Sequence, residues 1–168
     1  MLNLDFPNGH TVGLFPNLKN STVKNLIVEG YVRGLAIVGG IAGRISETTI
    51  SNCINLAYIE NTVAPTFEGI DALGGIVGRA ENSSVINNCL NLGDVTGVTA
   101  GGIVGILDKS VVSDCMNTGY VKGLGKYNGG IVGISYNMPW DYEISNCLNL
   151  GTVEGEINTT GPICGFCQ

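Results

Sequence analysis

The chain has 168 residues, of which 44% are hydrophobic, 13% are charged and 26 are glycine. This hydrophobic content is sufficient for a buried core, whereas the glycine content disfavours long helices, because glycine costs a helix interior about 1 kcal/mol relative to alanine. The net charge of −6, with eight scattered Lys and Arg residues, argues against a nucleic-acid partner. No stretch approaches the ~20 apolar residues of a membrane span, so we expect no membrane insertion by this segment.

Residues 1–11 are expected to form a lead-in segment before a repetitive region. They contain no basic stretch followed by an apolar one, so this segment shows no secretion signal. His10 is the sole histidine of the chain. A zinc site that needs two histidines is therefore excluded, and we predict neither a metal nor a cofactor.

A glycine-centred block and a cysteine-centred block alternate along the rest of the chain. The glycine block reads GGIAG at 39–43, GGIVG at 74–78, 101–105 and 129–133, and GPICG at 161–165. The cysteine block reads SNCINLAYI at 51–59, NNCLNLGDV at 87–95, SDCMNTGYV at 113–121 and SNCLNLGTV at 145–153. A degenerate copy, VGLF at 12–15 and VKNLIVEGYVRG at 23–34, has Leu26 at the cysteine position. Such self-similarity indicates stacked supersecondary units.

Each repeat places β-branched residues between glycine and asparagine at short intervals, which is typical of brief strands joined by tight turns. A unit of this size cannot bury its own apolar face, so equivalent residues must stack about 4.8 Å apart. The sequence therefore predicts an all-β fold, a parallel β-solenoid (β-helix) of about five coils with roughly three short strands per coil. We expect right-handed winding, which dominates parallel crossovers. The solenoid is expected to span residues 12–168, with coils at 12–38, 39–73, 74–100, 101–128 and 129–160 and a partial coil at 161–168.

Four cysteines recur at the same place in the second block and invite a metal or disulfide interpretation. They are Cys53, Cys89, Cys115 and Cys147. Each belongs to a different coil but the same column, so neighbouring sulfurs point alike and do not converge on one metal. Because Leu26 occupies this column in the first copy, we predict that these cysteines pack as small hydrophobic residues.

Cys164 and Cys167 have the C-x-x-C spacing of redox motifs, but they lack the helical context that activates such thiols. Cys164 occupies the column of Val77, Val104 and Val132, which favours a structural role. Whether Cys164 and Cys167 are redox-active is left open.

Two columns of polar residues lie beside the cysteine column. One contains Asn55, Asn91, Asn117 and Asn149, and the other contains Asn25, Asn52, Asn88, Asp114 and Asn146. Stacked amides can hydrogen-bond along a column and satisfy the backbone of turns, so we expect both columns at solenoid corners. Asp114 is the only acid among them, which argues against a calcium site.

Uneven spacing of the repeats places extra residues in two loops, Thr62–Leu73 and Ser135–Glu143. Insertions in a solenoid tend to gather on one face, often the binding face. The second loop carries Tyr136, Trp140 and Tyr142, and an exposed aromatic cluster is a common platform for carbohydrate or protein contacts. We therefore predict these three as binding residues, with the first loop as a second candidate. The alternative is that the aromatic side chains fold back over the solenoid.

Acidic residues in the loops leave an enzymatic alternative open. They are Glu68, Asp71, Glu81, Asp108, Asp141 and Glu143. Two of them could approach each other as in glycan-cleaving enzymes. Solvated carboxylates are the simpler interpretation, and we predict no catalytic residue.

The segment TVGLFPNLKNSTVKNLIVEGYVRG, followed by VGGIAG, TISNC and three rounds of GGIVG with NxCxNxGxVxG, resembles the GLUG-motif repeats of bacterial surface and secreted proteins. The resemblance covers residues 12–165. Such repeats occur in adhesin-like proteins and in the non-catalytic regions of IgA-cleaving metallopeptidases. The resemblance implies a spacer or adhesive module at an extracellular or cell-surface location, attached to other domains of a parent chain.

We therefore expect a non-enzymatic structural or adhesive repeat module that binds host protein or glycan. Two alternatives stand beside it: a glycan-cleaving β-helix enzyme that uses loop carboxylates, and a module that self-associates end to end by pairing exposed strand edges. The last glycine block opens just before Gln168, so we also expect this chain to be a piece of a longer protein.

Overall fold

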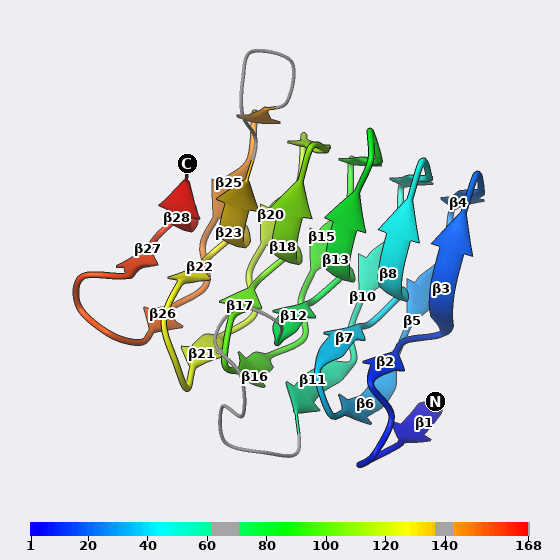
Figure 1. The fold of residues 1–168 in the computed structure, drawn as a ribbon, viewed down its shortest axis with the longest axis horizontal. Helices are drawn as coiled ribbons and strands as arrows, with labels where there is room; N and C mark the ends of the chain where they lie inside the picture. Colours follow the sequence, from blue (N-terminus) through cyan, green and yellow to red (C-terminus); the bar gives the residue numbers. More distant parts are fainter. Residues whose placement is uncertain (62–70, 137–142, 168) are drawn as a thin grey trace.

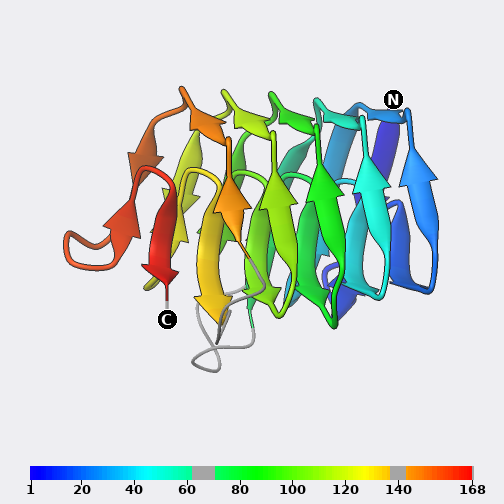
Figure 2. The same ribbon diagram turned by 90° about the horizontal axis from the view of Figure 1, so that it is seen from above.

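The computed structural model describes residues 1–61, 71–136 and 143–167, which form 28 short strands. Every pairing between them is parallel, and each strand pairs with the strand five places away in the chain. Figures 1 and 2 show the coils following one another along the long axis, with the two termini at opposite ends. The predicted parallel β-solenoid is therefore confirmed. Its right-handed winding stays a prediction.

The strands form five sheets, which we name A to E. Sheet A contains β1 (Leu2–Asp5), β6 (Gly30–Gly34), β11 (Tyr58–Asn61), β16 (Val95–Gly97), β21 (Val121–Gly123) and β26 (Val153–Glu154). Sheet B contains β2 (Thr11–Val12), β7 (Ile37–Gly39), β12 (Ala72–Gly74), β17 (Ala100–Gly101), β22 (Asn128–Gly129) and β27 (Thr160–Gly161). Sheet C contains β3 (Phe15–Lys19), β8 (Ala42–Ser46), β13 (Val77–Glu81), β18 (Val104–Asp108), β23 (Val132–Tyr136) and β28 (Cys164–Cys167).

The other two sheets have five strands each. Sheet D contains β4 (Thr22–Lys24), β9 (Thr49–Ser51), β14 (Val85–Asn87), β19 (Val111–Ser113) and β24 (Ile144–Ser145). Sheet E contains β5 (Ile27–Val28), β10 (Ile54–Asn55), β15 (Leu90–Asn91), β20 (Met116–Asn117) and β25 (Leu148–Asn149). A complete coil thus contributes one strand to each sheet in the order B, C, D, E, A.

Each coil has five strands where the sequence predicted roughly three. The glycine block forms two strands, because the chain turns a corner between Gly39 and Ala42. The cysteine block also turns, at a residue in the left-handed backbone region, where asparagine is enriched. These corner residues are Asn25, Asn52, Asn88, Asp114 and Asn146, with φ between 50° and 58°. The Asn25 column therefore lies at a corner, as predicted.

The register of the sheets reproduces the alignment of the repeats. Gly39, Gly74 and Gly101 occupy successive positions of one column, which Gly129 and Gly161 continue. Residues 2–5, expected as part of a lead-in segment, form β1 and pair with β6. The solenoid therefore includes residues that precede the recognisable repeat.

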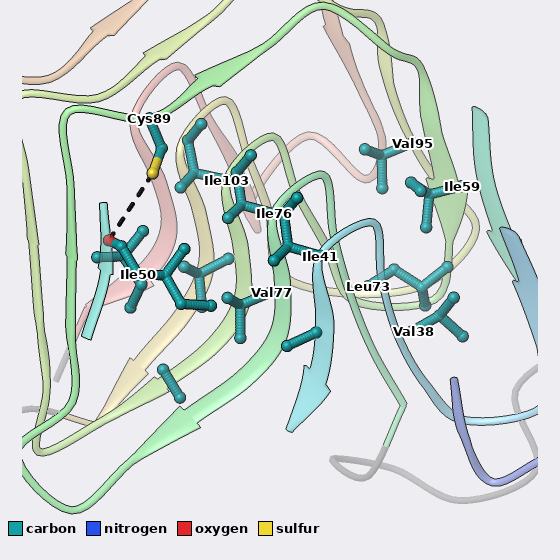
Figure 3. Packing of buried hydrophobic residues seen from close by; sticks show 14 of the residues in the cluster. Val38, Ile41, Ile50, Ile59, Leu73, Ile76, Val77, Cys89, Val95 and Ile103 are labelled. Atoms are coloured by element: carbon teal, nitrogen blue, oxygen red, sulfur yellow. Dashed lines mark hydrogen bonds between the residues drawn. The ribbon is translucent and has the colours of Figure 1, made fainter. Parts of the chain in front are cut away.

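The core lies inside the coils, where equivalent side chains stack on one another (Figure 3). Ile41, Ile76 and Ile103, from three consecutive glycine blocks, are fully buried. Burial of a side chain of this size stabilises the fold by roughly 1.5–3 kcal/mol. The interior of the stack is thus a packed core.

Candidate functional site

The predicted binding loop begins at the end of β23. Tyr136 is the last residue of that strand, and its side chain is exposed. Trp140 and Tyr142 lie outside the described residues, as does most of the second candidate loop at 62–73. The binding role of these three aromatic residues therefore stays a prediction.

Asp71 and Leu73 close the second candidate loop on its C-terminal side, and both are buried. Burial raises the pKa of the Asp71 carboxyl, while the charge of His10 opposes that rise. Asp71 is therefore not the solvated loop carboxylate that the sequence led us to expect.

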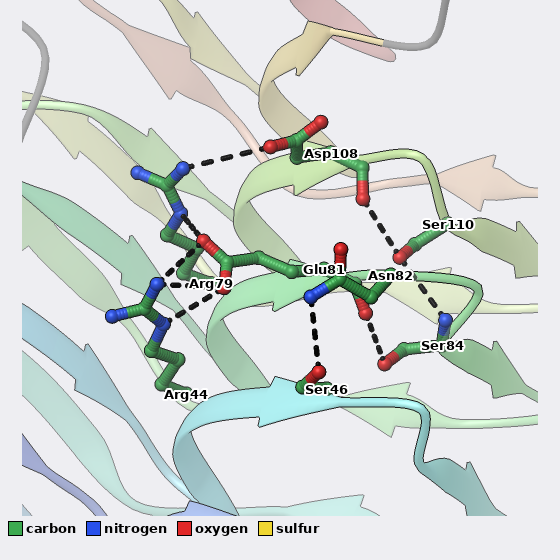
Figure 4. Close-up of polar contacts among 8 residues, drawn as sticks. All are labelled: Arg44, Ser46, Arg79, Glu81, Asn82, Ser84, Asp108 and Ser110. Atoms are coloured by element: carbon green, nitrogen blue, oxygen red, sulfur yellow. Dashed lines mark hydrogen bonds and ion pairs between the residues drawn. The ribbon is translucent and has the colours of Figure 1, made fainter. Parts of the chain in front are cut away.

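Glu81 and Asp108 belong to an ion-pair cluster on sheet C (Figure 4). The side chain of Arg44 contacts both carboxylate oxygens of Glu81, with an Nη2–Oε2 distance of 2.7 Å. Arg79 contacts Glu81 through Nε at 2.5 Å and Asp108 through Nη2 at 3.6 Å. The cluster joins strands β8, β13 and β18 and thus three successive coils.

The register of the coils explains why this cluster forms. Arg44 and Arg79 are direct neighbours in one column, so two positive charges lie one rung apart. The Glu81 side chain, which is 10% exposed, lies against both guanidinium groups and offsets their repulsion. These carboxylates therefore form ion pairs that connect neighbouring coils.

The column of four free cysteines is part of the core. Cys53, Cys89 and Cys115 are buried and Cys147 is half-buried. Each thiol donates to the carbonyl oxygen two residues earlier, as in Cys115 Sγ to Ser113 O at 3.1 Å. The prediction of core packing is confirmed for this column.

Cys164 and Cys167 are joined by a disulfide. Cys164 occupies the column of Val132, as predicted, and Cys167 lies in register with Ser135. The bond therefore links the first and last residues of the last described strand, β28. This pairing was not predicted from the sequence, which had left the state of these thiols open.

The asparagines of sheet E form a ladder of side-chain hydrogen bonds. The Nδ2 atoms of Asn55, Asn91 and Asn117 each donate to the Oδ1 atom of the next asparagine, at 2.7–2.9 Å. The same Nδ2 atoms also donate to the carbonyl oxygen two residues later in their own coil. Asn149 ends the ladder and donates to Gly151. The predicted role of this column in joining coils is confirmed.

A strip of tyrosines on sheet A was missed by the sequence analysis. Tyr31 and Tyr58 stack with ring centroids 5.9 Å apart, and the Tyr31 hydroxyl donates to Glu60. Tyr120 follows further along the column and donates to Glu154. The pKa of Tyr31 is raised mainly by burial of its hydroxyl. The pKa of Tyr120 is raised mainly by its hydrogen bond to Glu154. The sequence contains a signal for this strip, because a tyrosine stands five residues after the cysteine position in three of the repeats.

The part of the chain that the structure describes contains no group of three or more His, Cys, Asp or Glu side chains able to hold a metal ion. Among the same residues, no helix has the length and apolar character needed to cross a membrane.

Fold and site together define a β-solenoid repeat module in which the columns of repeated residues connect successive coils. The chain is similar to halomucin from Haloquadratum walsbyi (strain DSM 16790 / HBSQ001), with 31% identity over 137 residues. The match covers 74% of this chain and 2% of halomucin, so the chain corresponds to a small part of a much larger protein. No family model matches the chain, and the resemblance to GLUG-motif repeats stays a prediction. No solved structure matches it either.

Proposed function

We propose that this chain is a non-enzymatic structural module of a larger extracellular or cell-surface protein, in which the stacked coils hold other domains apart. The observation that carries the proposal is that polar and cysteine side chains connect neighbouring coils. The asparagine ladder, the cysteine column and the Arg44–Glu81 pair all connect one coil with another. These side chains are thus engaged in contacts between coils.

The geometry suits a spacer. Each complete coil is paired through five sheets with both of its neighbours, so bending the rod would break several strand pairs at once. Each added coil lengthens the rod by about 4.8 Å, the distance between paired strands. A repeat of this kind sets distance in proportion to the number of coils.

Two observations support the extracellular location. Disulfides persist mainly in oxidising compartments, and Cys164 and Cys167 form one. The similarity to part of halomucin supports the same placement and the role as one segment of a long chain.

A distance measurement between the two ends tests the spacer role. Asn3 and Thr152 are exposed and lie in one column of sheet A, five rungs apart, which corresponds to about 24 Å between their Cα atoms. Spin labels at both positions, in a Cys147→Leu background that removes the half-buried thiol, should give one narrow distance distribution. A broad distribution would contradict a rigid spacer.

The adhesive part of the proposal concerns host protein or glycan at the loop that contains Tyr136, Trp140 and Tyr142. The exposure of Tyr136 beside this loop supports it. Glycan and protein arrays should show binding by the full chain and its loss in Trp140→Ala. Binding that is unchanged in this variant would remove the loop from the proposal, and turnover of any glycan would contradict the non-enzymatic assignment.

A further inference from the structure

The tyrosine strip runs along sheet A, whose strands β6, β11, β16 and β21 follow one another in Figure 1, and it is interrupted at one rung. Tyr31 and Tyr58 are in register, and the next two positions of their column belong to Asp94 and Tyr120. Each of the four is followed by a fully buried residue: Val32, Ile59, Val95 and Val121. Since side chains alternate along a strand, the strip faces outward, and Asp94 takes the place of one ring.

The tyrosine side chains lean in one direction, toward the next coil. The Tyr31 hydroxyl donates to Glu60 and the Tyr120 hydroxyl donates to Glu154, which hold equivalent places on the following rungs. The rings of Tyr31 and Tyr58 are 12° from parallel, with centroids 5.9 Å apart. Because Tyr58 and Tyr120 are two rungs apart, a planar group in place of the missing ring would lie about 5.9 Å from both.

Asp94 gives this gap in the strip a negative charge. Its side chain is exposed, and its Oδ1 atom accepts the backbone N–H group of Tyr120 at 2.9 Å. Asp94 forms no ion pair with any residue that the structure describes. The pKa of Tyr58 is raised mainly by burial and that of Tyr120 mainly by its hydrogen bond to Glu154, and the charge of Asp94 adds to the rise at both. A carboxylate close to two aromatic rings favours a cation between them.

A guanidinium group suits this gap better than an ammonium group. It is planar, it stacks on aromatic faces, and its N–H groups form a fork that matches a carboxylate. A cation attracts a ring whose centroid lies within about 6 Å, and that condition is met on both sides of the gap. Lys122 on the following coil carries the same charge as such a ligand, whereas Glu154, in register with Lys122, carries the opposite one.

A second copy of the chain is a poor source of the guanidinium group. The arginines of the sequence are Arg33, Arg44 and Arg79. Each of them forms an ion pair with a carboxylate of its own copy. A second copy would therefore have to break one of these ion pairs to supply the ligand, which favours a different polypeptide as the partner.

Two exposed leucines extend the surface beside the gap. Leu56 and Leu92 come two residues before Tyr58 and Asp94, and they lie on neighbouring rungs, since β10 pairs with β15. Each leucine is 43% exposed. Adjacent exposed apolar side chains are typical of contact surfaces. A polypeptide with an apolar residue near its arginine can cover these leucines, whereas a free guanidinium ion cannot.

We propose that Tyr58, Asp94 and Tyr120 bind an arginine side chain of a partner polypeptide, with the guanidinium group between the two rings and paired with Asp94. This site goes beyond the spacer role, because it gives the side of the module a specific contact. It also differs from the predicted binding loop. The site lies on sheet A, whereas Tyr136 ends a strand of sheet C.

The probe is a short acetylated and amidated peptide with arginine at its centre, leucine two residues away on either side and glycine elsewhere. Titrated into the full isotope-labelled chain, it should shift the backbone amide signals of Asp94 and Tyr120 saturably, with a dissociation constant of roughly millimolar order. A matched peptide with citrulline keeps the planar shape without the charge and should bind at least about tenfold more weakly. A peptide with lysine should bind with an affinity between the two.

Variants of the protein test the position of the site. Asp94→Tyr places a ring in the gap and should abolish binding, while Asp94→Asn removes only the charge and should weaken the arginine peptide about tenfold. Tyr58→Leu, beside the gap, should weaken binding about fivefold. Tyr31→Leu, one rung further from the gap, is the matched control and should change the affinity less than about twofold. Unchanged amide signals away from sheet A establish that each variant is folded.

Four outcomes would overturn the proposal. Equal affinity for the arginine and citrulline peptides would refute a cation site, and equal affinity for the arginine and lysine peptides would refute a planar one. Binding that survives Asp94→Tyr, or the lack of any saturable shift, would remove the site from this face. Concentration-dependent dimers that exclude the peptide would assign the same face to a second copy of the chain.

Discussion

Gly75 lies directly against the side-chain amide of Asn91: a Cβ atom at Gly75 would be 2.3 Å from Cγ and 2.4 Å from Oδ1 of Asn91. The two residues come from different repeated blocks. The same contact joins Gly40 with Asn55, Gly102 with Asn117 and Gly130 with Asn149. The glycine block and the cysteine block therefore recur together because each asparagine of the ladder occupies space that only a glycine leaves free.

Gly75→Ala should destabilise the protein by about 3 kcal/mol, the upper part of the range for overpacked sites. The added methyl group would also meet the Gly102 carbonyl oxygen at 2.3 Å, which is backbone and cannot rotate away. Urea unfolding followed by circular dichroism measures the effect. Leu92→Ala, at an exposed side chain beside the ladder, is the matched control and should cost less than about 1 kcal/mol. Similar midpoints for the two variants would refute the steric role of Gly75.

Asn91→Ala should cost about 3 kcal/mol, because it leaves Asn55 without an acceptor and Asn117 without a donor inside the core. Asn149→Ala, at the half-buried end of the ladder, breaks the bond from Asn117 and should cost roughly half as much. The difference in free energy of unfolding between the two variants is the measurement. An equal loss of unfolding free energy in the two variants would show that burial does not determine how much each hydrogen bond of the ladder contributes.

Glu81→Gln should destabilise the protein by about 2 kcal/mol, less than a fully buried pair because the Arg44 side chain is 48% exposed. The substitution leaves the neighbouring guanidinium groups of Arg44 and Arg79 without their shared counter-charge. Added salt should reduce the loss by screening the two positive charges. A salt-independent loss would instead indicate that packing of the Glu81 side chain matters more than its charge.

Alkylation should distinguish the cysteines of the column by position and by pH. The neighbouring thiols and burial raise the pKa of Cys115, whereas the adjacent Cys115 thiol lowers the pKa of Cys147 to about 7. Because the thiolate is the nucleophile, the reaction of Cys147 with iodoacetamide should accelerate as pH rises through about 7. Buried Cys115 should react only when the protein unfolds, and mass spectrometry of digested protein assigns each site. Equal rates at Cys115 and Cys147 in the folded protein would contradict the buried column.

Much of the fold could be predicted because a solenoid converts sequence columns into spatial columns. Leu26 in the cysteine column was enough to identify a core position, and the asparagines at fixed spacing indicated a ladder. The number of strands was harder to predict, since Asn52 interrupts what appears in sequence as one continuous strand. Arg44 and Glu81 are 37 residues apart in the chain, and their ion pair occurs once. No repeated pattern in the sequence therefore predicted this pair. The candidate site is predicted least well, because a repeat identifies the scaffold and says little about what the loops bind.

Removing one coil tests most directly the claim that this protein is a stack of equivalent coils that sets a distance. Deletion of residues 101–128 joins Ala100 to Gly129, which is in register with Gly101, so the columns continue across the junction. We expect a folded protein in which the spin-label distance between Asn3 and Thr152 decreases by about 4.8 Å. Deletion of residues 101–114, which removes only part of a coil, should abolish folding. An unfolded protein after the full-coil deletion, or an unchanged distance, would contradict the account.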